Sequence, residues 1–246
     1  MPSTEKEWFA DWFDSPFYHI LYKHRDTKEA KDFLTLLLDY LQIEPQSKIL
    51  DLACGSGRHS VFLYSQGFKV HGYDLSENSI RLANNYSKNG LRFSVQDMRQ
   101  PFPDTNFDFV FNLFTSFGYF EEKSENIQVL KNINNALKPK GGLVIDYLNM
   151  GRVLANFDIN QTKTVDGITF NIHREIVKNQ LVKTIQFNAN GRPYSFTEKV
   201  SAFGLPEFLD MLDIAGFDLR QIFGDYKLGP YNKANADRLI IVAYKR

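Results

Sequence analysis

Short apolar runs alternate with helix-like segments between residues 46 and 150, and this rhythm constrains the fold more than any other feature of the chain. The runs lie at 48–52, 68–74, 91–95, 107–113 and 143–147, with helix-like segments at 58–66, 77–88 and 124–137. Strands that are apolar almost throughout, rather than alternating with polar residues, are typical of a parallel sheet covered on both faces. The pattern therefore predicts an α/β fold with a doubly wound, mostly parallel sheet.

The flanking parts of the chain differ from this core. Residues 1–45 are helix-like, with Pro16 placed as at the first position of a helix, and predict an N-terminal helical cap. Beyond residue 150, β-rich runs separated by turn residues predict an inserted antiparallel β meander. Its runs lie at 164–176, 181–187 and 194–201, and a helix at 205–215 and strands at 217–223 and 238–244 follow. The expected units are a cap at 1–45, an α/β domain at 46–150 and 203–246 with seven strands, and a β subdomain at 151–202.

Composition excludes several classes of function. The 246 residues hold 29 Lys plus Arg and 29 Asp plus Glu, and this neutral balance argues against nucleic acid as a partner. A single cysteine, Cys54, rules out an intramolecular disulfide and a thiolate zinc cluster within the chain. The histidines show no metal-ligand spacing, so we assign no metal. Neither a signal-peptide core nor an apolar run of about 20 residues is present, so we expect a cytoplasmic protein with no membrane partner.

The loop Asp51-Leu52-Ala53-Cys54-Gly55-Ser56-Gly57 carries the most chemical information. It ends an apolar strand and opens a helix, whose N-terminus presents free N–H groups to a ligand. Gly55 and Gly57 permit a tight turn and a close approach of that ligand. Asp74 ends the next strand, where a carboxylate suits the two hydroxyls of a ribose. The arrangement predicts a nucleotide-type site.

Two nucleotide ligands compete for such a loop. A dinucleotide cofactor favours glycine at the position that Ser60 occupies here, and its pyrophosphate would face the carboxylate of Asp51. An aspartate with an ordinary pKa of about 3.9 is ionised at neutral pH and opposes bound phosphate. S-adenosylmethionine has no phosphate, and its ammonium and sulfonium groups are cationic. Asp51 therefore favours S-adenosylmethionine, and a dehydrogenase is the disfavoured alternative.

The chain resembles the class I S-adenosylmethionine-dependent methyltransferases in several motifs that occur in the family's order. The glycine loop is similar to motif I, and Asp74 matches the acidic end of the second strand. Residues 96–98 follow the third strand, where the family places an acidic residue and a backbone N–H against adenine. Phe107-Asp108-Phe109-Val110 with Asn112-Leu113 resembles motif II, and 137–142 resembles the turn before the fifth strand. The likeness covers about 46–146 and the last two strands.

The resemblance implies a Rossmann-like methyltransferase fold with S-adenosyl-L-methionine as the cofactor. Asp51 is expected at the methionine ammonium, Tyr22 and Arg25 at the methionine carboxylate, and Leu75 and Met98 against the adenine. The full expected cofactor set is Tyr22, Arg25, Asp51, Ala53, Gly55, Gly57, Asp74, Leu75, Gln96, Asp97, Met98 and Leu113.

The acceptor of the methyl group is less well defined. Asp97-Met98-Arg99 with residues 114–119 is similar to small-molecule N-methyltransferases, including those acting on amino sugars. We expect methyl transfer to nitrogen or oxygen of a small molecule, in a partly aromatic pocket beneath the β subdomain and the N-terminal helices. The expected covering side chains are Trp8, Trp12, Phe17 and Tyr18, and the expected substrate pocket is Phe117, Tyr119, Asp146 and Tyr147.

Two alternatives stay open. A methyltransferase acting on a macromolecule is disfavoured by the neutral charge and by Asn112-Leu113-Phe114-Thr115, which replaces the family's Asn/Asp-Pro-Pro-Tyr signature. A non-catalytic nucleotide-binding protein with the same fold differs from an enzyme only in turnover. The sequence assigns no catalytic base and no oligomeric state.

Overall fold

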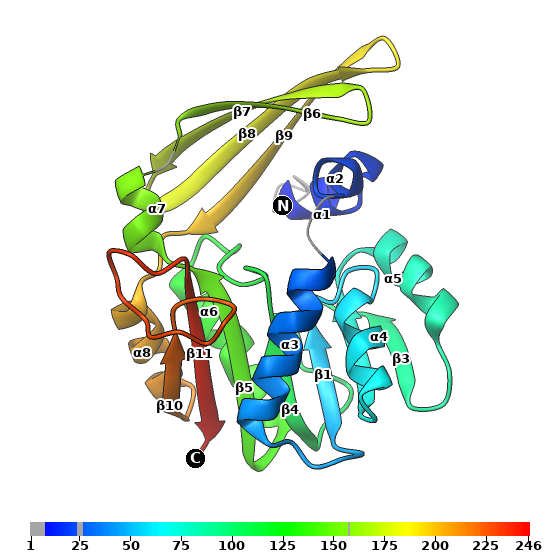
Figure 1. Ribbon diagram of the computed structural model, residues 1–246, viewed down its shortest axis with the longest axis vertical. Helices are drawn as coiled ribbons and strands as arrows, with labels where there is room; N and C mark the ends of the chain where they lie inside the picture. Colours follow the sequence, from blue (N-terminus) through cyan, green and yellow to red (C-terminus); the bar gives the residue numbers. More distant parts are fainter. Residues whose placement is uncertain (1–7, 24–26, 157) are drawn as a thin grey trace, which may run out of the picture.

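The computed structural model describes residues 8–23, 27–156 and 158–246. The larger of its two sheets has seven strands in the order β10-β11-β5-β4-β1-β2-β3 (Figure 1). These are β1 (Lys48–Leu52), β2 (Lys69–Asp74), β3 (Leu91–Val95), β4 (Phe107–Asn112), β5 (Leu137–Leu148), β10 (Phe217–Phe223) and β11 (Arg238–Lys245). Strands β1 to β5 pair in parallel, whereas β11 is antiparallel to β5 and β10. The predicted seven-stranded, mostly parallel α/β sheet is confirmed.

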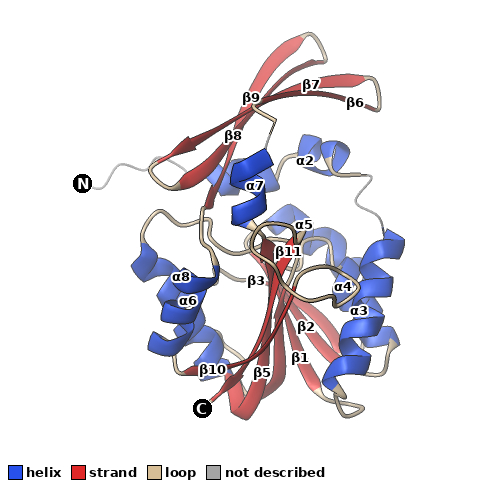
Figure 2. Ribbon diagram, turned by 60° about the vertical axis from the view of Figure 1, so that its left-hand side comes forward, coloured by secondary structure: helices blue, strands red, loops and turns tan. Residues whose placement is uncertain are grey.

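Helices cover both faces of this sheet. On one face lie α3 (Thr27–Leu41), α4 (Arg58–Ser65) and α5 (Glu77–Ala83), and on the other lie α6 (Lys123–Ala136) and α8 (Leu205–Ile214) (Figure 2). Successive strand residues alternate between the two layers, so that Ile49 packs with α3 and Leu50 packs with α6. Burial on both sides explains why these strands are almost continuously apolar. The helix expected at 77–88 ends at Ala83 and continues as a 3-10 turn at Asn84–Tyr86.

The turn expected at 138–142 is wrong, because β5 begins at Leu137 and passes through this segment. Leu137 pairs with Phe107 and Gly142 pairs with Phe109, with a shift of register between the two pairs. The intervening residues therefore bulge within the strand instead of ending it. Gly142 is required there, since a Cβ on this residue would overlap the ring of Phe109.

Replacing Gly142 by alanine is expected to lower the free energy of unfolding by about 1–3 kcal/mol, because the added methyl group overpacks the core. Thermal unfolding measures the effect, at roughly 2–4 °C per kcal/mol for a chain of this size. Combining Gly142→Ala with Phe109→Leu provides the control. The double variant should lose less stability than the sum of the two single variants, and strict additivity would contradict the overlap.

The smaller sheet is an antiparallel meander in the order β6-β7-β8-β9 (Figure 1). Its strands are β6 (Asn160–Val165), β7 (Ile168–Val177), β8 (Gln180–Ala189) and β9 (Arg192–Ser201). The sequence indicates only three strands here, because residues 164–176 form one continuous β-rich run. In the structure a turn at Asp166-Gly167, with φ of 47° and 79°, divides that run into two strands. Helix α7 (Met150–Asn156), which the sequence analysis did not identify, precedes the meander.

The N-terminal segment is divided between the two sheets. Helices α1 (Trp8–Phe13) and α2 (Pro16–Leu21) pack on the small sheet, where Trp12 and Leu21 join an apolar cluster with Phe170 and Ile185. Helix α3 packs instead on the large sheet. Figure 1 shows α1 and α2 between the meander and the carboxyl ends of the parallel strands. Among the described residues, no helix combines the length and apolar character that a membrane span requires.

A buried polar network fixes α1 and α2 on the small sheet. Glu198 of β9 accepts hydrogen bonds from Trp12 Nε1 and from the Tyr22 hydroxyl, each at 2.6 Å. It also pairs with Lys183 of β8 at 3.0 Å, and this ammonium together with the hydrogen bonds holds the pKa of the Glu198 carboxyl below its ordinary value despite burial. The network therefore also sets the position of the side chains that α1 and α2 direct toward the large sheet.

Candidate functional site

A cavity of about 340 Å³ lies at the carboxyl ends of β1, β2, β3 and β4. It gathers most of the residues that the sequence analysis selected from separate parts of the chain. Those on its wall are Tyr22, Asp51, Ala53, Gly55, Asp74, Leu75, Gln96, Asp97, Met98, Leu113 and Tyr119. Gly57 does not line the cavity, and Arg25 lies outside the described residues.

The two loop glycines have different surroundings. A Cβ at Gly55, where φ is +54°, would point into open space on the cavity wall. A Cβ at Gly57, where φ is +85°, would come within 2.7 Å of the Phe93 ring. Gly57 therefore permits close packing of the α4 N-terminus against β3, whereas Gly55 leaves room at the cavity.

Asp51 is the most deeply buried carboxylate of the site, with 1% of its surface exposed. The Ser60 hydroxyl donates to its Oδ2 at 2.5 Å. Burial raises the pKa of Asp51 to about 6, and the nearby Asp74 adds to the rise. At neutral pH the carboxylate is thus mostly ionised, and a cationic group of a ligand in the cavity would relieve the cost of burying it.

Asp74 joins the glycine loop to the end of β2. Its Oδ2 accepts from Gly55 N at 2.7 Å and its Oδ1 from Ser76 N at 2.9 Å. Burial raises the pKa of this carboxyl above its ordinary value. Each carboxylate oxygen has two acceptor positions, so both oxygens can accept a further hydrogen bond from a ligand.

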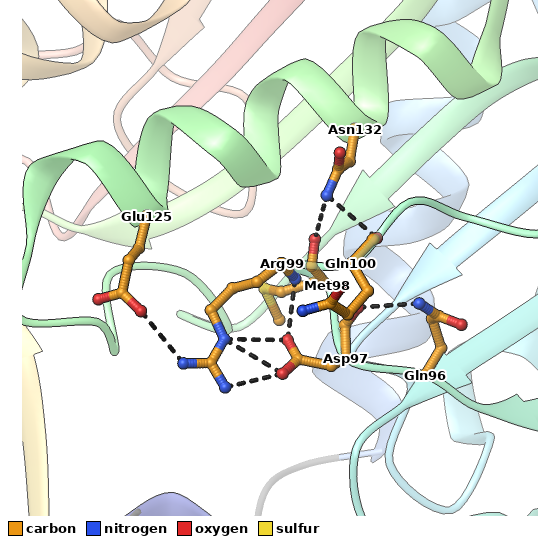
Figure 3. A network of polar contacts seen from close by, with 7 residues as sticks. All are labelled: Gln96, Asp97, Met98, Arg99, Gln100, Glu125 and Asn132. Carbon is orange, nitrogen blue, oxygen red and sulfur yellow. Dashed lines mark hydrogen bonds and ion pairs between the residues drawn. The ribbon is translucent and has the colours of Figure 1, made fainter. Parts of the chain in front are cut away.

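The segment after β3 forms the third acidic part of the wall (Figure 3). Asp97 is held by Arg99, whose Nη2 lies 2.7 Å from Oδ2. Arg99 Nη1 also pairs with Glu125 of α6 at 3.1 Å. Asn132 of α6 donates to the backbone oxygens of Met98 and Gln100, at 3.0 Å each. Two turns of α6 therefore fix this segment in place.

Several residues of the cavity wall were not expected from the sequence. Helices α1 and α2 and the following turn contribute Phe9, Phe13, Tyr18, His19 and Lys23, of which only Tyr18 was expected near the site. Arg58 and His59 at the start of α4 and Phe114 after β4 also line it, and His59 stacks on Phe114 with 4.7 Å between ring centroids. The position of Arg58 directly after the glycine loop is a sequence signal that could have identified it. No comparable signal marks the N-terminal side chains.

Three of the four expected substrate-pocket residues do not line this cavity or its neighbour. Phe117 and Tyr147 are buried and pack against Phe208 of α8, and the Tyr147 hydroxyl donates to the Ser201 backbone oxygen. Asp146 is fully buried beneath the 114–115 turn, where it pairs with Arg238 at 2.7 Å. Phe117 follows β4, and Asp146 and Tyr147 lie near the end of β5, which suggested exposure to substrate. The loops that follow β4 and β10 cover these positions.

Most of the aromatic side chains expected to cover the pocket pack against other parts of the protein instead. Trp12 is fully buried in the small-sheet cluster, and Phe17 packs against Phe187 and Tyr194. Trp8 packs edge-on against Tyr119 without lining either cavity.

A second cavity of about 380 Å³ adjoins the first and extends toward the small sheet. The two share a wall of five aromatic side chains, namely Phe13, Tyr18, Tyr22, Phe114 and Tyr119. The far side of the second cavity is formed from both sheets and carries charged groups, among them Arg174, Lys183, Glu198 and Arg238. Tyr22 contributes its ring to the shared wall, while its single hydroxyl proton goes to Glu198. The methionine carboxylate contact expected of Tyr22 therefore has no hydroxyl donor in this arrangement.

The donor set of the first cavity suits one kind of nucleoside. Carboxylates lie at or just beyond the ends of three adjacent parallel strands, at Asp51, Asp74 and Asp97. This arrangement favours a ligand with cationic and hydroxyl groups and opposes a pyrophosphate. Among the described residues, no group of three or more His, Cys, Asp or Glu side chains has a geometry that could hold a metal ion. The sheet and this cavity define an α/β protein with an acidic, nucleoside-type site at the carboxyl ends of its parallel strands.

Comparison with known proteins identifies the family. Residues 49–141 match the model of a methyltransferase domain. The chain is 30% identical to the putative methyltransferase YqeM of Bacillus subtilis (strain 168) over 210 residues, 81% of this chain and 85% of that protein. It is 27% identical to the glycine N-methyltransferase of Oryctolagus cuniculus over 249 residues, 86% of this chain and 83% of that protein.

Solved structures have the same fold. An S-adenosylmethionine-dependent methyltransferase from Clostridium acetobutylicum ATCC 824 matches with a TM-score of 0.78 and 18% identity, covering 93% of this chain and 96% of that one. The S-adenosylmethionine-bound amino pentose methyltransferase CalS10 from Micromonospora echinaspora matches with a TM-score of 0.69 and 19% identity, covering 94% and 98%. The chain belongs to the class I S-adenosylmethionine-dependent methyltransferases. It is an enzyme, and S-adenosylmethionine is its cofactor.

Proposed function

We propose that this enzyme transfers the methyl group of S-adenosylmethionine to nitrogen or oxygen of a small molecule. The observation that carries the proposal is the pair of adjoining cavities with a shared aromatic wall. We assign the cofactor to the first cavity and the acceptor to the second. The acceptor cavity, at about 380 Å³, suits a small molecule better than an extended polymer.

Each acidic side chain has a separate proposed role. Asp51 faces the methionine ammonium, Asp74 accepts from the ribose hydroxyls, and Asp97 accepts from the adenine amine. Leu75, Met98 and Leu113 give apolar contact, and Arg58 replaces Tyr22 as the proposed partner of the methionine carboxylate.

When bound, the cofactor supplies a methyl group that its sulfonium has already activated. The chain's task is to hold the acceptor in line and to exclude water, which contributes up to ~7–11 kcal/mol in favourable cases. The rings of Phe114 and Tyr119 lie between the two cavities and are the proposed positioning surface. An amine acceptor needs only to be neutral when it attacks, so the proposal requires no dedicated base.

The relatives support an amine as the acceptor. One is a glycine N-methyltransferase, and the CalS10 structure is that of an amino pentose methyltransferase. Their sequence identities of 27% and 19% leave the acceptor of this chain as a proposal.

A thermal-shift series tests the cofactor assignment and then the acceptor. At 100 times its dissociation constant a ligand adds about 2.7 kcal/mol of stability, which raises the unfolding midpoint by roughly 5–10 °C. We expect this rise with S-adenosylmethionine and with S-adenosylhomocysteine, and no rise with NAD. Small amines and hydroxyl compounds are then screened for methylation in the presence of S-adenosylmethionine. Turnover of a protein or RNA, with none of any small molecule, would overturn the proposal.

A further inference from the structure

We propose that Arg99 is a positioning residue that makes the cofactor site selective for adenine. It orients the Asp97 carboxylate so that one acceptor position remains for an amino group on the base. The inference rests on the proposed contact between Asp97 and adenine, and it adds a residue outside the expected cofactor set.

Arg99 donates hydrogen bonds to the Asp97 carboxylate from three separate N–H groups (Figure 3). The Arg99 backbone N donates to Oδ1 at 2.8 Å. Nε lies 3.1 Å from both oxygens, and Nη2 lies 2.7 Å from Oδ2. Both side chains are about one-fifth exposed, at 20% and 22%, so the pair is largely shielded from water.

The number of donors explains the selectivity. A carboxylate offers about four acceptor positions. Arg99 supplies three N–H groups, so about one position remains on Asp97, a residue of the cavity wall. A single N–H of the exocyclic adenine amine fits that position. A base with an oxo group at the same place would bring its own acceptor oxygen against the acceptor oxygen of Asp97. Such a base should therefore bind more weakly.

The guanidinium is itself held from several sides. Its Nη1 pairs with Glu125 at 3.1 Å, and its carbon lies 4.7 Å from the ring centroid of Phe120 and 5.7 Å from that of Phe9. Asn132 fixes the neighbouring backbone through two hydrogen bonds. The planar, forked guanidinium of Arg99 is therefore held in one orientation, and its hydrogen bonds hold the Asp97 carboxylate in one orientation as well.

Calorimetric titration with two probes tests the proposal in the full chain. S-adenosylhomocysteine carries the amine, whereas S-inosylhomocysteine carries an oxo group in its place. We expect the unchanged protein to bind the adenosyl probe at least about tenfold more tightly. Arg99→Met should reduce this ratio to about threefold or less. Arg99→Lys should reduce it as well, because an ammonium keeps the charge but lacks the planar fork.

The matched control is Arg220→Met on the exposed face of β10, at the opposite edge of the sheet from β3. It removes the same charge and should leave the ratio unchanged. Since both probes are measured on the same variant, a general loss of stability does not alter their ratio.

The outcomes separate the two assignments. If Asp97→Asn alters the ratio and both Arg99 variants retain it, the role of Arg99 is overturned while Asp97 keeps its contact with adenine. If Asp97→Asn retains the ratio, the adenine contact itself is overturned. An Arg99→Lys variant that behaves as the unchanged protein shows that charge suffices, which also contradicts orientation by the fork.

Discussion

Replacing Asp51 by asparagine is expected to lower the affinity for S-adenosylhomocysteine by about 100-fold or more. The variant keeps an oxygen that accepts from the Ser60 hydroxyl but loses the charge that is proposed to face the methionine ammonium. Truncation of one partner of a buried, hydrogen-bonded charge pair costs about 2–5 kcal/mol. Calorimetric titration at neutral pH measures the loss, and Asp218→Asn on the exposed part of β10 is the matched control.

The same variant is expected to be at least as stable as the unchanged protein without ligand. Burial raises the pKa of Asp51 from 3.8 to about 6, so ionisation of this group opposes folding by about 3 kcal/mol at neutral pH. This opposition is absent below pH about 4 and is complete above pH about 6. The stability advantage of Asp51→Asn should therefore grow as the pH rises from about 4 to about 6 and stay constant above that pH.

The pH dependence of cofactor binding has the opposite sign. Below the Asp51 pKa of about 6 the carboxyl becomes neutral, and the affinity of the unchanged protein should fall by up to about tenfold per pH unit. Asp51→Asn should lack this dependence. Unaltered affinity in Asp51→Asn, or the same decline with pH in both proteins, would remove Asp51 from the ammonium site.

Replacing Asp146 by alanine is expected to destabilise the fold by about 3–5 kcal/mol, although this residue lines neither cavity. The change removes a fully buried carboxylate from the Arg238 guanidinium, whose side chain is only 13% exposed. It also removes the acceptor of Phe114 N, at 2.8 Å, and of the Tyr226 hydroxyl, at 3.1 Å. The thermal midpoint should fall by roughly 10 °C.

Asp146 also maintains an unfavourable backbone conformation at the cavity wall. Phe114 and Thr115 have φ of 57° and 62°, and such angles are costly for a β-branched residue. Asp146 accepts from Phe114 N and its backbone oxygen accepts from Thr115 N, while Arg238 Nη2 donates to Thr115 Oγ1 at 2.8 Å. Loss of Asp146 should therefore displace Phe114 from the wall between the cavities.

Two further variants test this account. Asp210→Ala breaks the exposed pair with Lys123 and should cost at most about 1 kcal/mol. Combining Asp146→Leu with Arg238→Met replaces the buried pair by apolar groups and should recover much of the stability. Equal effects of Asp146→Ala and Asp210→Ala would contradict the importance assigned to the buried pair.

The sequence by itself determined the sheet and the acidic side of the first cavity. Asp51, Asp74 and Asp97 were identifiable because each lies at or just beyond the end of a buried strand. Parallel strands of a doubly wound sheet bring those ends to one edge, so proximity follows from local pattern and topology. The glycine loop was also identifiable from the sequence, because its tight turn depends on the glycines within the loop itself.

Only the tertiary structure decided how the N-terminal helices and the loops after β4 and β10 pack at the carboxyl ends of the parallel strands. The helices that supply Phe13 and Tyr18 are held by Trp12 and Glu198, which are 186 positions apart in the chain. Asp146 resembled a substrate ligand in the sequence, yet the side chains of Arg238 and Tyr226 close over it from 92 and 80 positions away. Contacts of such long range depend on how separate surfaces fit together, and neither periodicity nor motif spacing encodes that fit.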